Sequence, residues 1–316
     1  MKILFSSVGR RVELMQCFKA AADELGTDLI IYGADASITA PAMYFCDKQY
    51  VVPRISSPNY ISALLEICRN ENIEILIPTI DTDLMLLSEH KEDFERIGTK
   101  VLVSNPDKVL VSRDKRLTGK FFEECGLSAP ETTDNILCYH GGFPAFIKPK
   151  DGSSSINAYK VESQEDLKMY SCKVPNYIIQ PFISGTEYTV DIFCDFEGSP
   201  IYITPRERIQ TRAGEVLKTR ISLDAGIIED MQRFIKRFKP CGAVTVQLIK
   251  ETHSERNIYI EINPRFGGGA PLSIKAGANS ARALLELCQG KKLAYIPHAA
   301  EDKAVFCRFD QSIRIS

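Results

Sequence analysis

The sequence has few histidines and no cysteine pairs, and both absences limit the chemistry that we expect of it. The four histidines lie far apart, at positions 90, 140, 253 and 298. The ten cysteines occur singly along the chain, without a CxxC motif, so neither a zinc site nor a disulfide framework is indicated. A Ser/His or Cys/His nucleophile has little support for the same reason. We expect the cysteines in the helical patterns to be small buried hydrophobic residues.

The sequence also lacks an excess of charge and a long apolar run. Lys plus Arg number 39 against 41 for Asp plus Glu, a net charge of -2, so electrostatics gives no reason to expect nucleic acid or an acidic membrane as a partner. No apolar run approaches a membrane-spanning length, and the amino terminus enters a strand-like run at once. We expect a cytoplasmic protein that acts on small molecules.

What is present begins with a regular alternation over residues 1–104. Apolar strand-like runs (KILFSS, LIIYGAD, EILIPT, KVLVS) alternate with amphipathic helices predicted at 12–25 and near 60–70. This pattern is typical of a parallel sheet covered by helices on both faces. The sequence therefore predicts an α/β, Rossmann-like domain with ligands at the carboxyl ends of its strands.

Two loops of this domain contain candidate ligands for a substrate. The first, SSVGRR at 6–11, has one glycine and no GxGxxG motif, so it is a weak dinucleotide fingerprint. Gly9 and Arg10 could instead hold a small anion at the start of a helix, with an arginine that simply begins the helix as an equal alternative. The second loop, 78–83, contains the carboxylates Asp81 and Asp83.

The middle of the chain contains features suited to binding phosphate. Ser112 is a plausible N-cap for a helix that ends at Gly126, and Lys115 in its first turn opposes the helix dipole, a penalty that an anion would offset. Lys148 ends a predicted strand and leads into a hydroxyl-rich turn at 151–155. Such a turn cradles phosphates through its amides and hydroxyls, although a plain surface turn explains it equally well.

The apolar run YIIQPFISG at 177–185 contains a connector that could face a nucleotide base. Gln180 is followed by Pro181, which fixes the chain direction and removes a donor. The backbone after it could read an adenine edge. Glu187 follows Gly185 closely, and its carboxylate is suited to ribose hydroxyls. The alternative for Glu187 is an exposed strand residue.

A predicted hairpin near the carboxyl end contains three oxygen-bearing side chains. Residues 242–249 (GAVTVQLI) and 257–262 (NIYIEI) are β-rich and flank a polar turn. Glu261 and Asn263 share a face of the second strand, and the turn brings Gln247 opposite Glu261. Mg²⁺ prefers such oxygens, with nucleotide phosphates and water completing its coordination. Pro264, Arg265 and the glycines at 267–269 follow, which favours this site over a solvated hairpin end.

Taken in chain order, these motifs resemble the ATP-grasp superfamily, most closely the ATP-binding halves of the carbamoyl phosphate synthetase large subunit. The resemblance rests on Lys115, Lys148, DGSSS at 151–155, QPFISGTEYTVD at 180–191, Gln247 and EINPRFGGG at 261–269. It implies an α/β ATP-grasp fold with three parts: a Rossmann-like domain over 1–104, a lid over 105–184 with a flap at 150–156, and a carboxyl-terminal part over 185–316 with the metal site.

The same resemblance implies a role for each matching residue. Mg²⁺, as one or two ions with Mn²⁺ as a substitute, would be ligated by Gln247, Glu261 and Asn263, and Arg265 would stabilise the transferred phosphoryl group. ATP would be bound by Lys115 and Lys148 at its phosphates, by the flap residues Gly152, Ser153, Ser154 and Ser155, by Gln180 and the backbone of Phe182 and Ile183 at adenine, and by Glu187 at the ribose.

Three departures from the family pattern are visible. Position 180 is glutamine where many relatives have glutamate, which keeps an acceptor for adenine but loses the charge. The flap lacks a second glycine, which puts its closure in doubt. The chain has one ATP-binding unit, without a glutaminase-like segment or a biotin-carrier signature, so complete carbamoyl phosphate synthesis by this chain is not expected.

The function implied is an ATP-dependent ligase that joins a carboxylate to an amine or thiol through an acylphosphate, releasing ADP and phosphate. A bicarbonate- or carbamate-phosphorylating enzyme, a noncatalytic ATP-binding protein and a dinucleotide oxidoreductase stay open as alternatives, as does a homodimer. Lys218 and Arg220 are the preferred catalytic candidates from the basic run at 206–220, part of which a solvated strand pair would explain. The candidate ligands for the acceptor are Gly9, Arg10, Asp81, Asp83, Gly267 and Gly268.

Overall fold

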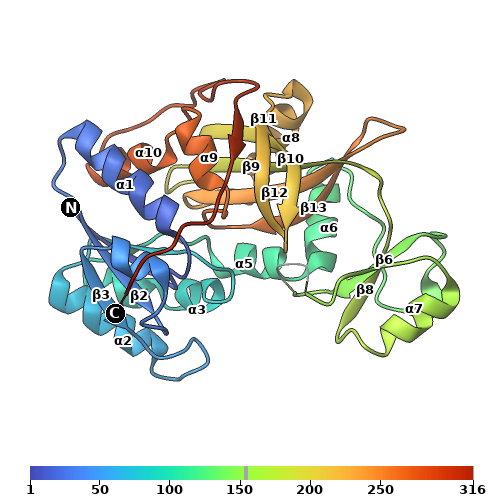
Figure 1. The fold of residues 1–316 in the computed structure, drawn as a ribbon, viewed down its shortest axis with the longest axis horizontal. Helices are drawn as coiled ribbons and strands as arrows, with labels where there is room; N and C mark the ends of the chain where they lie inside the picture. The colour runs from blue at the N-terminus through green and yellow to red at the C-terminus, as the bar shows by residue number, and fades with distance from the viewer. Residues whose placement is uncertain (153–155, 316) are drawn as a thin grey trace.

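The computed structural model in Figure 1 describes residues 1–152 and 156–315. Its three β-sheets follow one another along the chain, and the architecture is mixed α/β. The first sheet (blue) and the lid (green) lie toward opposite ends of the long axis, with the largest sheet between them. Among the described residues, no helix combines the length and apolar character needed to span a bilayer.

The first sheet is parallel and has the strand order β3-β2-β1-β4-β5, which confirms the predicted Rossmann-like sheet. Its apolar strands have cores on both faces, as parallel strands joined by helices require. Its strands are β1 (Lys2–Ser6), β2 (Ile30–Asp35), β3 (Lys48–Val51), β4 (Ile75–Pro78) and β5 (Lys100–Val101).

Helices cover the two faces of this sheet. Along β1, Ile3 and Phe5 face the core shared with the helix α1, whereas Leu4 faces the opposite core. The predicted helix over 12–25 is confirmed, and it ends at Gly26 in the left-handed conformation. The first core includes α1 (Val12–Leu25) and η1 (Pro41–Phe45); the second includes α2 (Tyr60–Glu71), α3 (Leu84–Glu89) and α4 (Lys91–Glu95).

Two short helices, α5 (Pro106–Arg113) and α6 (Lys115–Glu124), follow the first sheet. The prediction that Ser112 caps the second helix is wrong, because Ser112 lies in α5 and its hydroxyl donates to the carbonyl of Lys108 at 2.8 Å. Asp114 is the N-cap instead, accepting from the Arg116 amide at 3.0 Å. Lys115 is the first residue of α6, as expected.

The lid is a small antiparallel sheet with the order β7-β6-β8. Its apolar core forms between this sheet and the helix α7. All of these elements lie within the predicted lid of residues 105–184; whether the three parts are separate domains with the boundaries given above stays a prediction. The elements are η2 (Ile136–Cys138), β6 (Ala145–Pro149), β7 (Tyr159–Val161), α7 (Gln164–Ser171) and β8 (Tyr177–Pro181).

The third sheet is antiparallel, with the order β13-β12-β9-β10-β11-β14. One face packs on α8 (Ala225–Phe238) and α6. The other face packs on α9 (Ala270–Lys275) and α10 (Ser280–Cys288), which also contact α1. The strands are β9 (Gly185–Cys194), β10 (Pro200–Arg212), β11 (Glu215–Ile221), β12 (Ala243–Glu251), β13 (Asn257–Asn263) and β14 (Val305–Cys307).

The first and third sheets share one hydrophobic core, and Phe266 lies at the junction. Its ring packs edge-on against Phe18 of α1 at 5.8 Å between centroids and stacks on Phe193 of β9 at 6.0 Å. Phe266 is directly followed by the glycine run. The shared core therefore holds the loops of the first sheet against the segment where the predicted site lies.

Candidate active site

The predicted hairpin forms, and its register places the three oxygen-bearing side chains on one face. Gln247 of β12 pairs with Glu261 of β13, and Thr245 pairs with Asn263. Directly paired residues of antiparallel strands have their side chains on the same face. Strand β9 adds a third residue to each of these pairs, because Thr189 lies opposite Gln247 and Asp191 lies opposite Thr245.

The chemistry of these side chains fits a hard divalent cation. Within the described residues, no hydrogen bond or ion pair engages the side chains of Gln247 and Glu261, and Asn263 Oδ1 accepts one long bond, 3.4 Å, from Arg265. One carboxylate and two amide oxygens match the short ligand list of a Mg²⁺ ion that also binds nucleotide phosphates. Their role as metal ligands stays a prediction.

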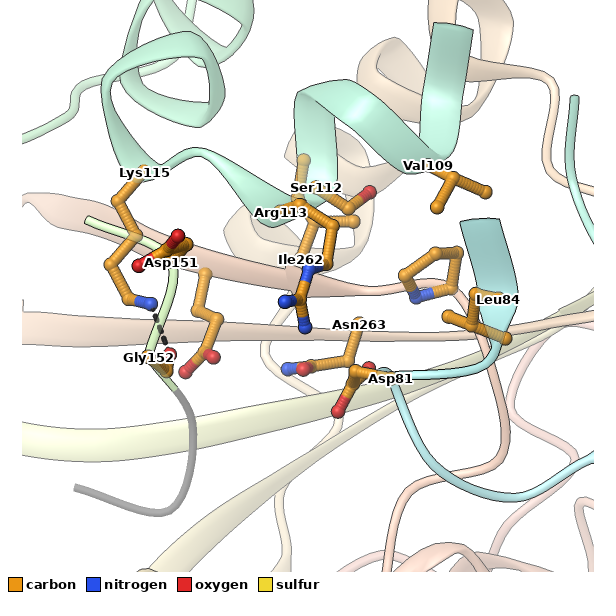
Figure 2. Close-up of a pocket in the computed structure, with 12 residues that line it drawn as sticks. Asp81, Leu84, Val109, Ser112, Arg113, Lys115, Asp151, Gly152, Ile262 and Asn263 are labelled. Atoms are coloured by element: carbon orange, nitrogen blue, oxygen red, sulfur yellow. Dashed lines mark hydrogen bonds between the residues drawn. The ribbon is translucent and has the colours of Figure 1, made fainter. Parts of the chain in front are cut away.

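Two lysines from separate elements lie beside this face. Burial and the neighbouring charge of Lys115 lower the pKa of Lys148 to about 8, although Glu261 acts in the opposite direction. The Nζ of Lys115 donates to the Gly152 carbonyl at 2.5 Å, as Figure 2 shows. Gly152, near the start of the predicted flap, is thus hydrogen-bonded to Lys115. Ser153, Ser154 and Ser155, the other predicted flap residues, lie outside the described residues.

A hollow of about 330 Å³ opens between these groups (Figure 2). The first sheet contributes the loop residue Asp81, and α5 contributes Arg113, a cation that the sequence pattern did not single out. The remaining lining includes Lys115, Gly152 and Asn263. The hollow therefore brings together the loop after β4, the flap and the hairpin, which are far apart in the sequence.

The predicted adenine connector lies at the end of β8. Gln180 is buried and its amide nitrogen donates to Thr132 Oγ1 at 2.8 Å. The backbone amide of Phe182 donates to the carbonyl of Pro144 at 3.1 Å. The amide of Ile183 makes no hydrogen bond in the described part of the chain, so Ile183 is the better placed of the two predicted backbone donors.

Glu187 and two arginines of β10 lie on the same face of the third sheet as Gln247 and Glu261. Arg208 is almost buried, and it donates to Glu187 Oε2 at 3.1 Å and to Thr189 Oγ1 at 3.3 Å. Burial lowers the pKa of Arg208, with Arg206 adding to this effect. The Glu187 carboxylate, which is predicted to bind ribose, thus forms an ion pair with Arg208.

Arg206 is more deeply buried, with 2% of its side chain exposed. Its Nε donates to Asp191 Oδ2 at 2.7 Å, and Ser273 donates to the same oxygen at 2.7 Å. Its Nη1 has no partner in the described part of the chain. The sequence left the roles of Arg206 and Arg208 open; their alternate spacing on one strand was the available signal.

Lys218 and Arg220 are placed differently from these arginines. Arg220 pairs across the strands with Glu207, which alternates with Arg206 and Arg208 and so points to the opposite face of the sheet. Lys218, two residues earlier on β11, shares the face of Arg220. Their predicted catalytic role stays a prediction, and the geometry favours Arg206 and Arg208 over them as the cations beside the hairpin.

In the loop after β1, the side chain of Arg11 is mostly buried, whereas that of the predicted ligand Arg10 is exposed. The side chain of Arg10 is 82% exposed and lies 3.4 Å from Asp310. The Gly9 amide donates to Asp35 Oδ2 at 2.9 Å, so it is already engaged. Arg11 is mostly buried and lies 3.4 Å from Glu215. The geometry therefore favours Arg11 over Gly9 and Arg10 as the residue that faces a ligand.

Asp83 is held by three hydroxyl groups, and its predicted substrate contact stays a prediction. Its carboxylate is completely buried and accepts from the hydroxyls of Ser6 at 3.0 Å, Ser7 at 3.1 Å and Tyr60 at 3.1 Å. Burial raises its pKa to about 6, although these hydrogen bonds act in the opposite direction. Asp83 therefore fixes the loop after β1 to the loop after β4.

Asp81, two residues earlier, contacts the predicted catalytic arginine. Its Oδ2 accepts from Arg265 Nη2 at 2.6 Å, and both side chains are nearly buried. Arg265 Nη1 also donates to the carbonyl of Phe266 at 3.1 Å. The guanidinium of Arg265 is thus held between the loop after β4 and the end of the β12–β13 hairpin.

The glycine run leaves room for neighbouring side chains. A Cβ at Gly268 would lie 2.5 Å from Arg11 Nη1, and one at Gly267 would lie 2.7 Å from Thr245 Oγ1. A Cβ at Gly269 would collide with the guanidinium of Arg206. The glycines therefore allow arginine side chains to pack directly against the backbone.

Comparisons with known proteins match this arrangement. One family model, described as the PylC-like N-terminal domain, matches residues 3–102, and a second, described as ATP-grasp in the biosynthetic pathway with Ter operon, matches residues 173–306. The match over residues 173–306 is thus to an ATP-grasp family. The resemblance predicted from the motifs is thereby confirmed, while neither model alone covers half of the chain.

Among curated relatives, a carbamoyl-phosphate synthase of Methanobrevibacter smithii is 24% identical over 265 residues, covering 78% of this chain and 70% of that protein. The carbamoyl phosphate synthase large chains of Pseudothermotoga lettingae and Gemmatimonas aurantiaca are matched over 28% of their own length. The chain thus spans about a quarter of these two relatives.

Solved structures show the fold. The biotin carboxylase of Campylobacter jejuni has a TM-score of 0.75 at 15% identity, covering 96% of this chain and 74% of that one. An L-amino acid ligase of Bacillus licheniformis has a TM-score of 0.71 at 14% identity, covering 92% of this chain and 75% of that one. These values confirm the predicted ATP-grasp fold with a preceding parallel-sheet domain.

Proposed function

We propose that this protein is an ATP- and Mg²⁺-dependent ligase that joins a carboxylate to an amine or thiol, with release of ADP and phosphate. The observation that carries the proposal is the common face on which Gln247, Glu261 and Asn263 lie beside two lysines and Arg265. The names of the similar proteins, which include an L-amino acid ligase and D-alanine–D-alanine ligases, support a ligase.

The nucleotide would lie between the lid and the third sheet. Lys115 and Lys148 would contact its phosphates, and their approach to each other in the free protein explains why an anion is favoured there. The open amide of Ile183 and the buried Gln180 would face adenine, and Glu187 the ribose. Ser153 to Ser155 would complete the flap.

Magnesium, or manganese in its place, would be held by Glu261, Gln247 and Asn263, as one or two ions. When bound, it would neutralise phosphate charge. The residues of the chain have separate tasks: the lysines hold the phosphates, and Arg265 faces the position of the transferred phosphoryl group. Positioning and charge neutralisation are sufficient for such a transfer, without a covalent protein nucleophile.

The chemistry takes two steps. A carboxylate oxygen of the acid attacks the γ-phosphorus of ATP, a new O–P bond forms, and the bond to ADP breaks. The amine then attacks the acyl carbon, phosphate leaves, and the amine loses a proton. Dividing one difficult condensation in this way is the reason to consume ATP. The acid and the amine would enter near Arg11, Asp81 and the glycines 267 and 268.

An enzyme that phosphorylates bicarbonate or carbamate is the second candidate, since the carbamoyl-phosphate synthase relatives favour it. We propose that the protein acts in the cytoplasm on small molecules, without nucleic acid, and a homodimer is compatible with this site. A noncatalytic ATP-binding protein is disfavoured, because Glu261 and Gln247 have no structural partner that would explain them within the described residues.

The test is ADP release by the purified protein over amino acids, amino sugars, dicarboxylates and bicarbonate. Glu261→Gln is the blank, and Glu255→Gln, a mostly exposed change in the turn of the same hairpin, is its matched control. Acid-dependent ADP release that the blank loses and the control keeps supports the ligase. Release stimulated by bicarbonate alone supports the second candidate, and ATP binding without release under any condition supports a noncatalytic protein.

A further inference from the structure

Arg11 lies where the first sheet meets the glycine run. It occupies the N-cap position of α1, and its side chain extends to the bare backbone of Gly268, where a Cβ would lie 2.5 Å from Nη1. Glu215 of β11 is 3.4 Å away on the same side. Because the position opposite Arg11 is glycine, the guanidinium is not covered by a side chain from that segment.

Most of the hydrogen-bonding capacity of Arg11 is unused. A guanidinium has five N–H donors, and the long bond to Glu215 is the one side-chain hydrogen bond that Arg11 makes within the described residues. Its side chain is 18% exposed. The group is therefore enclosed enough to have lost much of its water and open enough to receive a ligand.

The charges around Arg11 leave an excess of one positive charge. Asp81 is bound to Arg265 at 2.6 Å, and Glu215 lies nearer to Arg308, at 3.0 Å, than to Arg11. Burial and the charge of Arg265 both lower the pKa of Arg11. Ion pairs connect three cations and two carboxylates, namely Arg11, Arg308 and Lys275 with Glu215 and Glu13, and Arg265 and Asp81 form a separate neutral pair beside them.

Arg11 also has a defined position relative to the proposed reaction. Arg265 contacts the predicted metal ligand Asn263 and interacts with Arg11 through its charge. An acid whose reacting carboxylate lies at Arg265 would therefore direct its other end toward Arg11 and Gly268. An arginine with open donors is suited to a second carboxylate, which it can bind through two parallel hydrogen bonds.

We infer that Arg11 binds a second anionic group of the acid substrate, so that the protein selects dicarboxylates, or amino acids bound through their α-carboxylate, over simple monocarboxylates. This inference rests on the proposed function. Gly268 serves the same purpose by keeping the space in front of the guanidinium free. Arg11 is a specificity-determining residue and Arg265 the residue at the reacting carboxylate.

The experiment compares malonate, succinate, glutarate and L-glutamate with their monoamides in the ADP-release assay. The wild type is expected to prefer at least one diacid over its monoamide by about 10- to 100-fold in kcat/KM. Arg11→Met is expected to remove this preference by raising the KM for the diacid, with the KM for ATP unchanged, and Arg11→Lys to restore part of it. Arg69→Met, an exposed change near the end of α2, is the control and should match the wild type.

Equal use of diacids and monoamides by the wild type overturns the inference, as does an Arg11→Met variant that keeps the preference or changes the KM for ATP equally. A thermal-shift measurement with MgADP separates this failure from failure of the proposed function. If no acid releases ADP but succinate, glutarate or another of these diacids raises the Tm of the wild type and not of Arg11→Met, the ligase proposal fails and the binding site stands. If no diacid raises the Tm and none is turned over, both fail.

Discussion

Arg265 donates to Asp81 at 2.6 Å, across the junction between the first and third sheets. The two residues are 184 positions apart in the sequence. Asp81 follows β4 of the parallel sheet, and Arg265 follows β13 of the third sheet. The hydrophobic core around Phe266 holds both segments in place. The loop after β4 of the first sheet is therefore in direct contact with the residue proposed to stabilise the transferred phosphoryl group.

Replacing Asp81 with Asn tests whether this contact orients Arg265. The amide keeps the shape of the side chain but loses the charge that holds the guanidinium, so we expect kcat to fall about tenfold. The KM for ATP should change little, because the lysines and the connector are intact. Steady-state kinetics with the best acid provides the measurement.

Asp310→Asn is the matched control for this change. Asp310 also joins the first part of the chain to the third sheet, through Arg10 and Arg212, but its side chain is 63% exposed, and such pairs contribute little. Wild-type kinetics are expected. Equal losses in the two variants would show that Asp81 has no special effect on Arg265.

Replacing Glu261 with Gln tests the metal assignment. The change removes the one carboxylate of the predicted ligand set, so the metal and the phosphate charge it neutralises are held less well. We expect kcat/KM to fall at least about 100-fold and the Mg²⁺ concentration for half-maximal rate to rise. A magnesium titration of activity, run beside Glu255→Gln, decides the point, and an unchanged titration would contradict the assignment.

Lys148 predicts a pH dependence of nucleotide binding. Its pKa of about 8 in the folded protein lies below the value of about 10.4 for a free lysine. Phosphate next to the ammonium favours the charged form, so binding ATP raises this pKa again. Between about pH 8 and pH 10, binding must therefore take up a proton, and the affinity should fall by up to about tenfold per pH unit.

Calorimetry at pH 8.5 in two buffers with different ionisation enthalpies measures this uptake. The wild type should take up about 0.75 proton per molecule on binding MgATP, and Lys148→Met should lose that uptake along with most of the affinity. Lys168→Met, an exposed change on the lid helix α7, is the control. Proton uptake that persists in Lys148→Met would assign the effect to another group.

Asp83 predicts a pH dependence of stability. Its pKa is raised to about 6 from an ordinary value of 3.8, so between these values the folded state keeps a proton that the unfolded state has lost. The favourable contribution is complete below about pH 3.8 and is lost as the pH rises to about 6. The difference amounts to roughly 3 kcal/mol.

Denaturant unfolding of wild type and Asp83→Asn between pH 4 and pH 7 measures this contribution. The wild type should lose stability relative to the variant as the pH rises through this window, because the amide does not titrate. Parallel curves for the two proteins would show that burial of Asp83 does not govern this part of the pH profile.

Local patterns allowed much of the fold and part of the site to be predicted. The hairpin of Gln247 and Glu261 depends on alternation and a short turn, and both are contiguous in the sequence; its register is as predicted. The parallel sheet and the helix over 12–25 are specified in the same local way.

What was missed depends on tertiary packing. The pairing of Asp81 with Arg265 requires the contact between two sheets, which no local pattern specifies. The choice of Arg11 over Arg10 depends on the angle at which α1 begins, where one residue changes the direction of the side chain. Ser112 was misjudged because a separate short helix, α5, includes it and ends at Arg113, so the next helix begins two residues later than its sequence suggested.

Transfer of oxygen from the acid to phosphate reports whether the acid is activated as an acylphosphate. The acid found by the ADP-release screen is labelled with ¹⁸O in its carboxylate and turned over with MgATP and the amine. The account predicts one ¹⁸O atom in each inorganic phosphate released, because the carboxylate oxygen attacks the γ-phosphorus and leaves with it. Phosphate without ¹⁸O, formed while ligation proceeds, would contradict the account.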